Sequence, residues 1–301
     1  MTVQPGFTIA GGAYTAEIAR TGAGLRGLRR DGVALTEEWP LGAKPPLSAG
    51  LVLAPWPGRT EDGIYSFDGQ IHRLEVTSDV TGTADHGLVR RADWEDVEIA
   101  VDAVTLALDV GHHPGWPFDL HLRIRYSVGV NGLTCEFEAR NAGTVDLPFV
   151  VGFHTYLRVG DAAVDHCTLE LGARRWQPLN ERLLPDGPPR PVDGTDYDLV
   201  GPTPLVGRSL DTPFTATDGR YTVRAPEGEV TLWTDGNLPW VQVFIADPAE
   251  GKGFPGRGLD GAPGRALAVE PMSGPGNALH TGIDVAKISP GGLWACSWGI
   301  R

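Results

Sequence analysis

Two ionisable residues, Glu270 and His154, interrupt apolar runs that are typical of β-strands. Glu270 lies in Ala266-Leu-Ala-Val-Glu270-Pro-Met, directly before the turn Ser273-Gly-Pro-Gly-Asn277, and His154 lies in Phe149-Val-Val-Gly-Phe-His154-Thr-Tyr-Leu. Strand ends that lead into loops commonly hold reactive groups. A carboxylate and an imidazole held on strands can take a proton from one atom and give a proton to another. The two runs therefore predict an acid/base pair.

Each residue also has a purely structural interpretation, as a solvated glutamate at a strand edge or a histidine with a backbone partner in the core. The rest of the chain favours the functional interpretation, because a set of motifs follows in a fixed order. These motifs are Pro55-Trp-Pro-Gly-Arg59, Gly63-Ile-Tyr-Ser-Phe-Asp-Gly69, His86-Gly-Leu-Val-Arg90, Gly152-Phe-His154-Thr-Tyr156, Gly194-Thr-Asp-Tyr-Asp198, Leu210-Asp211-Thr-Pro-Phe214, Val241-Gln242-Val-Phe244, Glu270-Pro and Pro275-Gly-Asn277. The ordered set resembles the aldose 1-epimerase (galactose mutarotase-like) family from about the first predicted strand to the last residues.

This resemblance implies a reaction and a site. Members of the family interconvert the α and β anomers of a free aldose without a cofactor or metal ion, and the match implies that Glu270 is the base and His154 the acid. It also implies that Arg59 and His86 hydrogen-bond the sugar. Asp211 is expected to accept hydrogen bonds from two ring hydroxyls, with Gln242 and Tyr156 at the border of the site. Trp56 and Trp240 lie beside these motifs and can offer an apolar face to the ring.

The reference pKa values suit these roles. A carboxyl group with a pKa near 4.3 is ionised at pH 7, whereas an imidazole with a pKa near 6.5 is then only about one quarter protonated. Surrounding carboxylates are expected to raise the pKa of His154 and so enlarge the protonated fraction. One departure from the family concerns the substrate: the family usually has asparagine before the arginine, and this chain has Gly58.

The elements that position these residues are predicted to be short strands. Residues 121–128 and 133–139 alternate apolar and polar around Asn131-Gly132, and 221–224 and 229–233 do so around Pro226-Glu-Gly228. Such pairs are typical of β-hairpins, and no helical pattern of twelve or more residues occurs. The 41 glycines and 25 prolines are spread through all 301 residues without a linker. We therefore expect an all-β, large antiparallel β-sandwich of the mutarotase-like supersandwich type, a single domain over residues 1–301, with long loops at 172–205 and 247–265.

Charge and composition narrow the classes of partner. A net charge of -13 disfavours nucleic-acid binding. No run is long enough to span a membrane, and the N-terminus has no signal-peptide pattern, so we expect a cytoplasmic protein whose partner is a small monosaccharide. Its oligomeric state cannot be read from the sequence. The three cysteines, Cys135, Cys167 and Cys296, are interpreted as reduced core residues.

Several motifs imitate other sites. Two G-x-G-x-x-G runs begin at Gly22 and Gly256, but nearby turn residues leave no room for the helix that a dinucleotide site needs. The adjacent His112 and His113 sit between Gly111 and Pro114 and are interpreted as a turn. No tight metal-ligand spacing surrounds the other histidines, so no metal site is predicted.

Three alternatives stay open. A hexose-6-phosphate 1-epimerase needs basic groups for the phosphate. A sugar-binding protein without turnover needs no acid/base pair, and a glycosidase needs two carboxylates, for which Asp211 and Glu270 are available. Because the site motifs lack a basic cluster, the free aldose is expected to be the better substrate. Candidate phosphate ligands are Arg90-Arg91, Arg174-Arg175 and Arg257.

Overall fold

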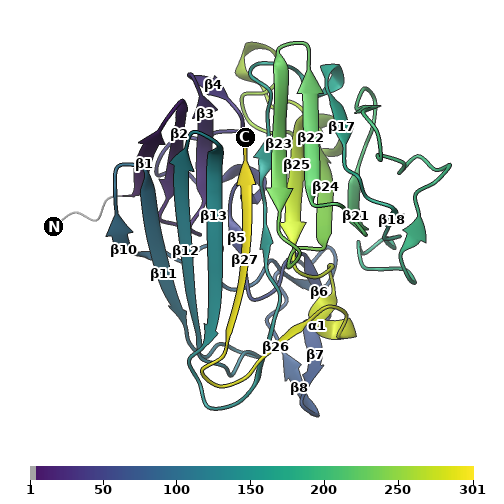
Figure 1. Cartoon of the computed structure of the whole chain (residues 1–301). Coiled ribbons are helices and arrows are strands. Elements are labelled where there is room, and N and C mark those ends of the chain that lie inside the picture. The colour runs from purple at the N-terminus through teal and green to yellow at the C-terminus, as the bar shows by residue number, and fades with distance from the viewer. Residues whose placement is uncertain (1–4) are drawn as a thin grey trace.

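The computed structural model describes residues 5–301 and is built on two large antiparallel sheets (Figure 1). Residues 1–4 of the N-terminal segment considered above lie outside the described residues. Within residues 5–301, no helix has both the length and the apolar character needed to cross a membrane. Because strands dominate and pair in antiparallel sheets, the expected all-β antiparallel fold is confirmed.

The larger sheet has nine strands. In spatial order they are β10 (Glu95–Ile99), β11 (Ala103–Val110), β12 (Leu120–Gly129), β13 (Gly132–Asn141), β27 (Leu293–Ile300), β23 (Gly228–Thr234), β22 (Arg220–Ala225), β17 (Thr168–Glu170) and β20 (Thr203–Pro204). The C-terminal strand β27 lies in its middle, between two segments that are far apart in the chain (Figure 1).

The second sheet has eight strands and supplies most of the site described below. Seven of them follow one another as β19 (Arg190–Pro191), β18 (Arg175–Trp176), β21 (Asp211–Thr215), β24 (Trp240–Ala246), β25 (Ala266–Met272), β15 (Gly152–Phe153) and β5 (Val52–Leu53). The eighth strand, β16 (Tyr156–Leu157), also pairs with β25.

Smaller sheets flank these two. One has four strands, β1 (Gly6–Gly11), β2 (Tyr14–Ala19), β3 (Leu25–Arg30) and β4 (Val33–Ala34). Three pairs complete the set: β14 (Leu147–Phe149) with β26 (Ala286–Ile288), β6 (Arg59–Glu61) with β9 (Thr83–Asp85), and β7 (Ile64–Phe67) with β8 (Gln70–Arg73). The helical elements of residues 5–301 are all short: α1 (Ala278–Thr281), η1 (Pro46–Ser48), η2 (Val164–His166), η3 (Pro248–Glu250) and η4 (Leu259–Gly261).

Both predicted hairpins are confirmed, with tighter turns than expected. Gly129 pairs with Gly132, so the turn of the first hairpin is Val130-Asn131, and Gly132 has a φ of 110° that favours glycine. Ala225 pairs with Gly228 in the second hairpin. The loop expected at 172–205 is interrupted by the two-residue strands β18, β19 and β20, and the loop at 247–265 contains η3 and η4. Strands this short leave no periodicity in the sequence that could reveal them.

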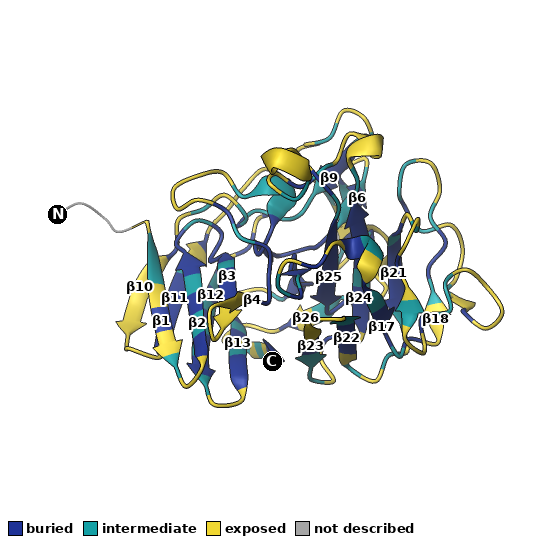
Figure 2. Ribbon diagram, turned by 90° about the horizontal axis from the view of Figure 1, so that it is seen from above, coloured by how far each residue is buried: buried dark blue, intermediate teal, exposed yellow. Residues whose placement is uncertain are grey.

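The core lies between the two large sheets. Along β12 buried and half-buried residues alternate, which is the pattern of a strand with one face on a core. The Phe137 ring of β13 packs edge-on against the Phe153 ring of β15, with ring centroids 5.6 Å apart. Trp298 of β27 also packs against Phe153, with ring centroids 5.3 Å apart. Figure 2 shows buried residues gathered in the central strands, whereas the edge strand β10 and the outer loops are exposed. The three cysteines are free and buried, as predicted.

Candidate active site

One cavity of about 280 Å³ brings together six of the seven residues that the sequence selects. Most of its floor comes from the eight-stranded sheet, and loops from other parts of the chain form its walls. The six are Arg59, His86, His154, Asp211, Gln242 and Glu270. They come from segments up to 211 positions apart, so their convergence is a property of the fold rather than of local sequence.

Strand geometry aligns the acidic and amide residues on one face. Gln242 on β24 lies directly opposite Glu270 on β25, and Pro213 on β21 lies opposite Gln242. Because side chains two residues apart share a face, Asp211 joins Pro213 on the same side of the sheet. The Gln242 amide Nε2 donates a hydrogen bond of 2.7 Å to Asp211 Oδ1. The other face of β25 carries Leu267 and Val269 into the core.

The sequence predicts Glu270 at a strand end, but the structure places it inside a strand. β25 continues for two more residues through Pro271, which pairs with Val241, to Met272. All seven residues of β25 are buried, because the strand has the core on one face and the cavity and loop residues on the other. Glu270 itself is only 4% exposed. A buried central position holds the carboxyl group more rigidly than a strand end does.

His154 lies in the short gap between β15 and β16. Its backbone N–H donates to the carbonyl of Leu51 at 3.0 Å, and its carbonyl accepts from the N–H of Gly50 at 2.8 Å. The ring stacks on Tyr156, with centroids 5.4 Å apart, and its Nε2 lies 3.5 Å from Glu270 Oε1. The predicted partners are thus in direct contact within a buried site.

Arg59 and His86 enter the cavity from the paired strands β6 and β9. Arg59 pairs with Asp85, and the backbone N–H of His86 donates to the carbonyl of Gly58 at 2.8 Å. His86 has a φ of 60°, a conformation that is uncommon outside glycine and often found at functional sites. Gly58 also has a φ of 60°, which asparagine tolerates better than most residues. The left-handed backbone at this position thus suits the glycine of this chain.

The closing motif is fastened to the same strand pair. The Asn277 N–H donates to the carbonyl of Arg59 at 2.6 Å, and its Oδ1 accepts from the Glu61 N–H at 2.9 Å. Gly276, next to Asn277, lines the cavity, and a Cβ on Gly58 would lie 3.1 Å from its Cα. The Pro275-Gly-Asn277 motif therefore holds Arg59 in place rather than offering a side chain to a ligand.

Three aromatic residues lie elsewhere than expected. Tyr156 does not line the cavity: it is buried behind His154 and supports that ring from one side. Trp56 donates to the carbonyl of Ala84 at 3.1 Å and packs on Trp116 in the core. Trp240 donates to Asp284 at 2.6 Å. Neither tryptophan lines the cavity. Their indole N–H groups need a partner when buried, and the structure supplies one inside the protein.

The cavity also contains residues beyond those that the family resemblance assigns to the site. Its apolar wall consists of Leu47, Leu179, Leu183, Pro213, Phe244 and Met272. Two basic side chains join Arg59 there, Arg90 and Lys252, and the Lys252 Nζ lies 3.7 Å from Asp211 Oδ2. The premise that the site lacks a basic cluster is therefore wrong. Arg90 closes the motif that begins at His86 and is one of the candidate phosphate ligands given above, whereas nothing in the 247–265 segment distinguishes Lys252.

A single arginine fastens the loop that carries two of these apolar residues. Leu179 and Leu183 belong to the loop 177–187, and Arg182 in the same loop reaches across to the β6–β9 region. Its guanidinium donates to the carbonyl of Thr81 at 2.8 Å and to Asp62 Oδ1 at 2.6 Å. Further bonds go to Glu61 and to the carbonyl of Gly82. Arg182 thus ties one wall of the cavity to the strands that hold Arg59.

Burial dominates the charge states of the acid/base pair. It raises the pKa of Glu270 well above its ordinary value, Asp211 adds to this shift and Arg59 opposes it. Burial also lowers the pKa of His154 to about 4; a backbone hydrogen bond opposes the shift and Arg90 adds to it. The expected rise in the pKa of His154 is therefore wrong, because loss of hydration outweighs the backbone hydrogen bond that opposes it. The pKa of His86 is lowered too, first by burial and then by His154.

A site of this kind can move protons on a polyol. His154 Nε2 and Glu270 Oε1 lie 3.5 Å apart, and Arg59, His86, Asp211 and Gln242 offer donors and acceptors around them. Among residues 5–301, no group of three or more His, Cys, Asp or Glu side chains is arranged to hold a metal ion.

Comparisons with known proteins agree with this chemistry. A sequence model of the family described as aldose 1-epimerase matches residues 6–291. The chain is 32% identical over 292 residues to the uncharacterised protein YihR of Escherichia coli (strain K12), covering 94% of this chain and 89% of that protein.

Solved structures show the same fold. The GalM/aldose epimerase homologue from C. elegans superimposes with a TM-score of 0.84 at 19% identity, covering 98% of both chains. The galactose 1-epimerase from Lactobacillus acidophilus NCFM has a TM-score of 0.78 at 18% identity, covering 98% of this chain and 94% of the other. At these identities the likeness concerns the fold alone.

Proposed function

Because the chain belongs to the aldose 1-epimerase family, we propose that it interconverts the α and β anomers of an aldose by acid/base ring opening. The observation that carries this proposal is the buried contact of 3.5 Å between His154 Nε2 and Glu270 Oε1, in a cavity lined by polar groups that suit a sugar. A protein that only binds a sugar does not need such a pair.

The proposed reaction has two halves. The Glu270 carboxylate takes the proton of the C1 hydroxyl while His154 gives a proton to the ring oxygen, so that the bond between C1 and that oxygen breaks and a carbonyl forms at C1. Rotation about the C1–C2 bond turns the other face of the carbonyl toward the freed hydroxyl. That hydroxyl attacks C1 and returns its proton to His154, and the new C1 hydroxyl takes its proton from Glu270. No proton is gained or lost over the cycle.

The remaining polar residues are assigned to holding the ring. Arg59 and His86 face the pair from the β6–β9 side, and Asp211 with Gln242 faces it from the sheet. We propose that Asp211 accepts from two ring hydroxyls and that Arg59 and His86 hydrogen-bond the sugar. Holding the ring in one pose turns proton transfer into a step between groups already in position.

A direct test follows the optical rotation of freshly dissolved α-anomers of glucose, galactose and other aldoses. The proposal predicts that the protein accelerates the approach to anomeric equilibrium for at least one of them and leaves the final rotation unchanged. A final rotation different from that of the uncatalysed sample would indicate another reaction and contradict the proposal.

The proposal also predicts the pH dependence. Between about pH 4 and the raised pKa of Glu270, Glu270 and His154 together hold one proton. The reactive form, with Glu270 ionised and His154 protonated, also holds one proton, so it forms without gaining or losing a proton. Below about pH 4 a second proton binds and no base is left; above the pKa of Glu270 the pair is fully deprotonated and no acid is left. We expect kcat/KM for anomer exchange to be flat at neutral pH and to fall on both sides. An acid limb near pH 6.5, the ordinary pKa of histidine, would contradict the buried environment of His154.

A further prediction concerns the wall fastened by Arg182. Arg182→Gln is expected to raise KM by about 3- to 10-fold with a smaller change in kcat, because its bonds are partly exposed and each contributes about 0.2–1 kcal/mol. Steady-state kinetics checks this, with Arg208→Gln as the matched control, since the Arg208 side chain lies outside the cavity and, within residues 5–301, bonds only to the carbonyls of Pro204 and Asp196. A fall in kcat at unchanged KM would show that the loop does not act by holding the sugar.

A further inference from the structure

A second, larger cavity of about 910 Å³ adjoins the candidate active site. The two cavities share three lining residues, Leu47, Ser48 and Arg90. Leu47 and Ser48 have φ values of 48° and 60°, so two consecutive residues hold a left-handed conformation at the junction. Such strain in non-glycine residues is often found at functional sites. The two cavities thus meet at a strained segment of the chain.

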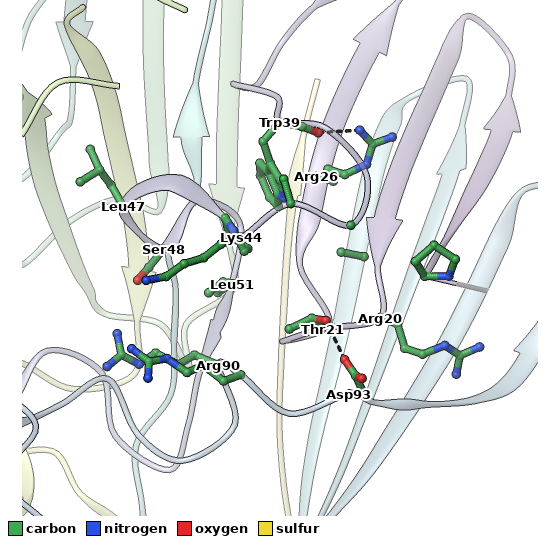
Figure 3. A pocket seen from close by; sticks show the side chains of 16 residues that line it. Arg20, Thr21, Arg26, Trp39, Lys44, Leu47, Ser48, Leu51, Arg90 and Asp93 are labelled. Atoms are coloured by element: carbon green, nitrogen blue, oxygen red, sulfur yellow. Dashed lines mark hydrogen bonds between the residues drawn. The ribbon is translucent and has the colours of Figure 1, made fainter. Parts of the chain in front are cut away.

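The second cavity is rich in basic side chains (Figure 3). Two of them are neutralised within the protein: Arg20 bonds to Asp96 at 2.8 Å, and Arg26 is paired with Glu17. By contrast, the side chains of Lys44, Arg90 and Arg91 make no hydrogen bond or ion pair with any residue in the described range 5–301. Figure 3 shows the Lys44 ammonium pointing toward the side of the cavity where Ser48 and Arg90 lie.

Of the three side chains Lys44, Arg90 and Arg91, Arg90 is the one that also lines the candidate active site. It is half-buried, and burial lowers its pKa, with Arg91 adding to the shift and Asp85 opposing it. Asp85 lines the same cavity but forms no ion pair with Arg90; its Oδ1 accepts from the Thr83 hydroxyl at 2.6 Å. A partly dehydrated guanidinium without a partner is unfavourable, and a bound anion would relieve it.

Arg90 lies on the histidine side of the acid/base pair. It follows His86 by four residues, and the His86 ring centroid is 5.9 Å from that of His154. At the junction, the N–H of Gly50, two residues after Ser48, donates to the His154 carbonyl at 2.8 Å. In agreement with this placement, Arg90 lowers the pKa of both His154 and His86, whereas the charges that act on Glu270 are Asp211 and Arg59. In the proposed reaction His154 serves the ring oxygen, which in a pyranose is bonded to C5, so the group on C5 is the part of the sugar assigned to the side of Arg90.

Resting on the proposed function, we propose that the substrate is an aldose that carries an oxyanion on its C6 atom, and that Arg90 binds this oxyanion. Lys44 and Arg91 add positive charge from the adjoining cavity. Although the protein carries a net charge of -13, the unpaired basic groups at the junction make the local field attractive. A bound oxyanion also offsets the effect of Arg90 on His154 and so favours the protonated acid.

The test compares kcat/KM for anomer exchange of glucose, glucose 6-phosphate and glucuronate at one ionic strength. The wild-type protein is expected to prefer at least one anionic sugar, and a preference for the phosphate or for the carboxylate tells which oxyanion fits. Arg90→Gln should lower the ratio of anionic to neutral kcat/KM by about 10- to 100-fold, as for a lost charge-assisted hydrogen bond, and Arg90→Lys by less. Arg174→Gln, a change at an exposed arginine that lines neither cavity, should leave the ratio unchanged.

The outcomes separate this inference from the proposed function. Turnover of glucose in preference to both anionic sugars, with the ratio unaffected by Arg90→Gln, contradicts the inference and leaves the epimerase proposal in place. Absence of turnover with every aldose contradicts the epimerase proposal instead. Binding is then tested without turnover: inorganic phosphate should raise the Tm of the wild-type protein and of Arg174→Gln but not that of Arg90→Gln. An equal rise in all three would overturn the assignment of Arg90.

Discussion

Replacement of Glu270 by glutamine is expected to lower anomer exchange by about two to four orders of magnitude. Glutamine keeps the shape of the side chain and its hydrogen-bonding capacity but cannot accept the C1 proton. Because Glu270 lies opposite Gln242 within a buried strand, the new amide has a place in the same cavity. Sugar binding, measured by calorimetry, should therefore be largely preserved while kcat falls.

A matched control for Glu270→Gln is Glu136→Gln. Glu136 lies on β13 in the nine-stranded sheet, is exposed, and lines no part of either cavity. This variant should keep the wild-type rate. Near wild-type exchange in Glu270→Gln itself would remove Glu270 as the base and, with it, the proposed mechanism.

The second large effect is expected at His154. His154→Asn should reduce kcat far more than it weakens sugar binding, because it removes the group proposed to protonate the ring oxygen. His86→Asn, in contrast, should weaken binding and turnover together, since His86 is assigned to orienting the sugar. The two ring centroids are 5.9 Å apart and both residues line the cavity, with His154 buried and His86 half-buried, so the pair is a closely matched comparison.

Steady-state kinetics and sugar titrations of the two histidine variants decide between these roles. The thermal unfolding midpoint of each variant should be recorded, because His154 stacks on Tyr156 and its loss also removes packing. The same balance of kcat and KM effects in both variants would mean that the roles of acid and orienting group are not divided in this way.

Sequence patterns predicted the fold and the site because both leave local signals. The hairpins alternate apolar and polar residues, and the ordered motifs selected six residues that the structure places around one cavity. Glu270 and His154 stand out because each interrupts an apolar run.

What the sequence could not show depends on contacts between distant segments. The sequence does not show whether the Tyr156 side chain borders the cavity or lies behind His154, because packing in the fold determines its position. Lys252 reaches Asp211 through a loop without a periodic pattern. The shifted pKa values of Glu270 and His154 come mainly from burial, which is created by the whole fold. Arg90 was visible as a basic residue, but not as an unpaired one at the junction of two cavities.

Two other functions make different predictions from the same residues. A glycosidase using Asp211 and Glu270 must release a new reducing end from a glycoside. In the structure, however, Asp211 Oδ1 accepts from Gln242 and its Oδ2 lies near Lys252, which suits a carboxylate that holds a ligand. A sugar-binding protein without turnover must bind an aldose and leave its anomer ratio relaxing at the uncatalysed rate.

Exchange spectroscopy by NMR at anomeric equilibrium tests the central claim most directly. The α and β signals of the C1 proton are followed for each aldose of the panel, with wild-type protein and with Glu270→Gln. The epimerase proposal predicts exchange between the two signals that is much faster with wild-type protein than without it, that is lost in Glu270→Gln, and that produces no other sugar. Bound sugar with no acceleration of exchange by the wild-type protein for any aldose of the panel would contradict it.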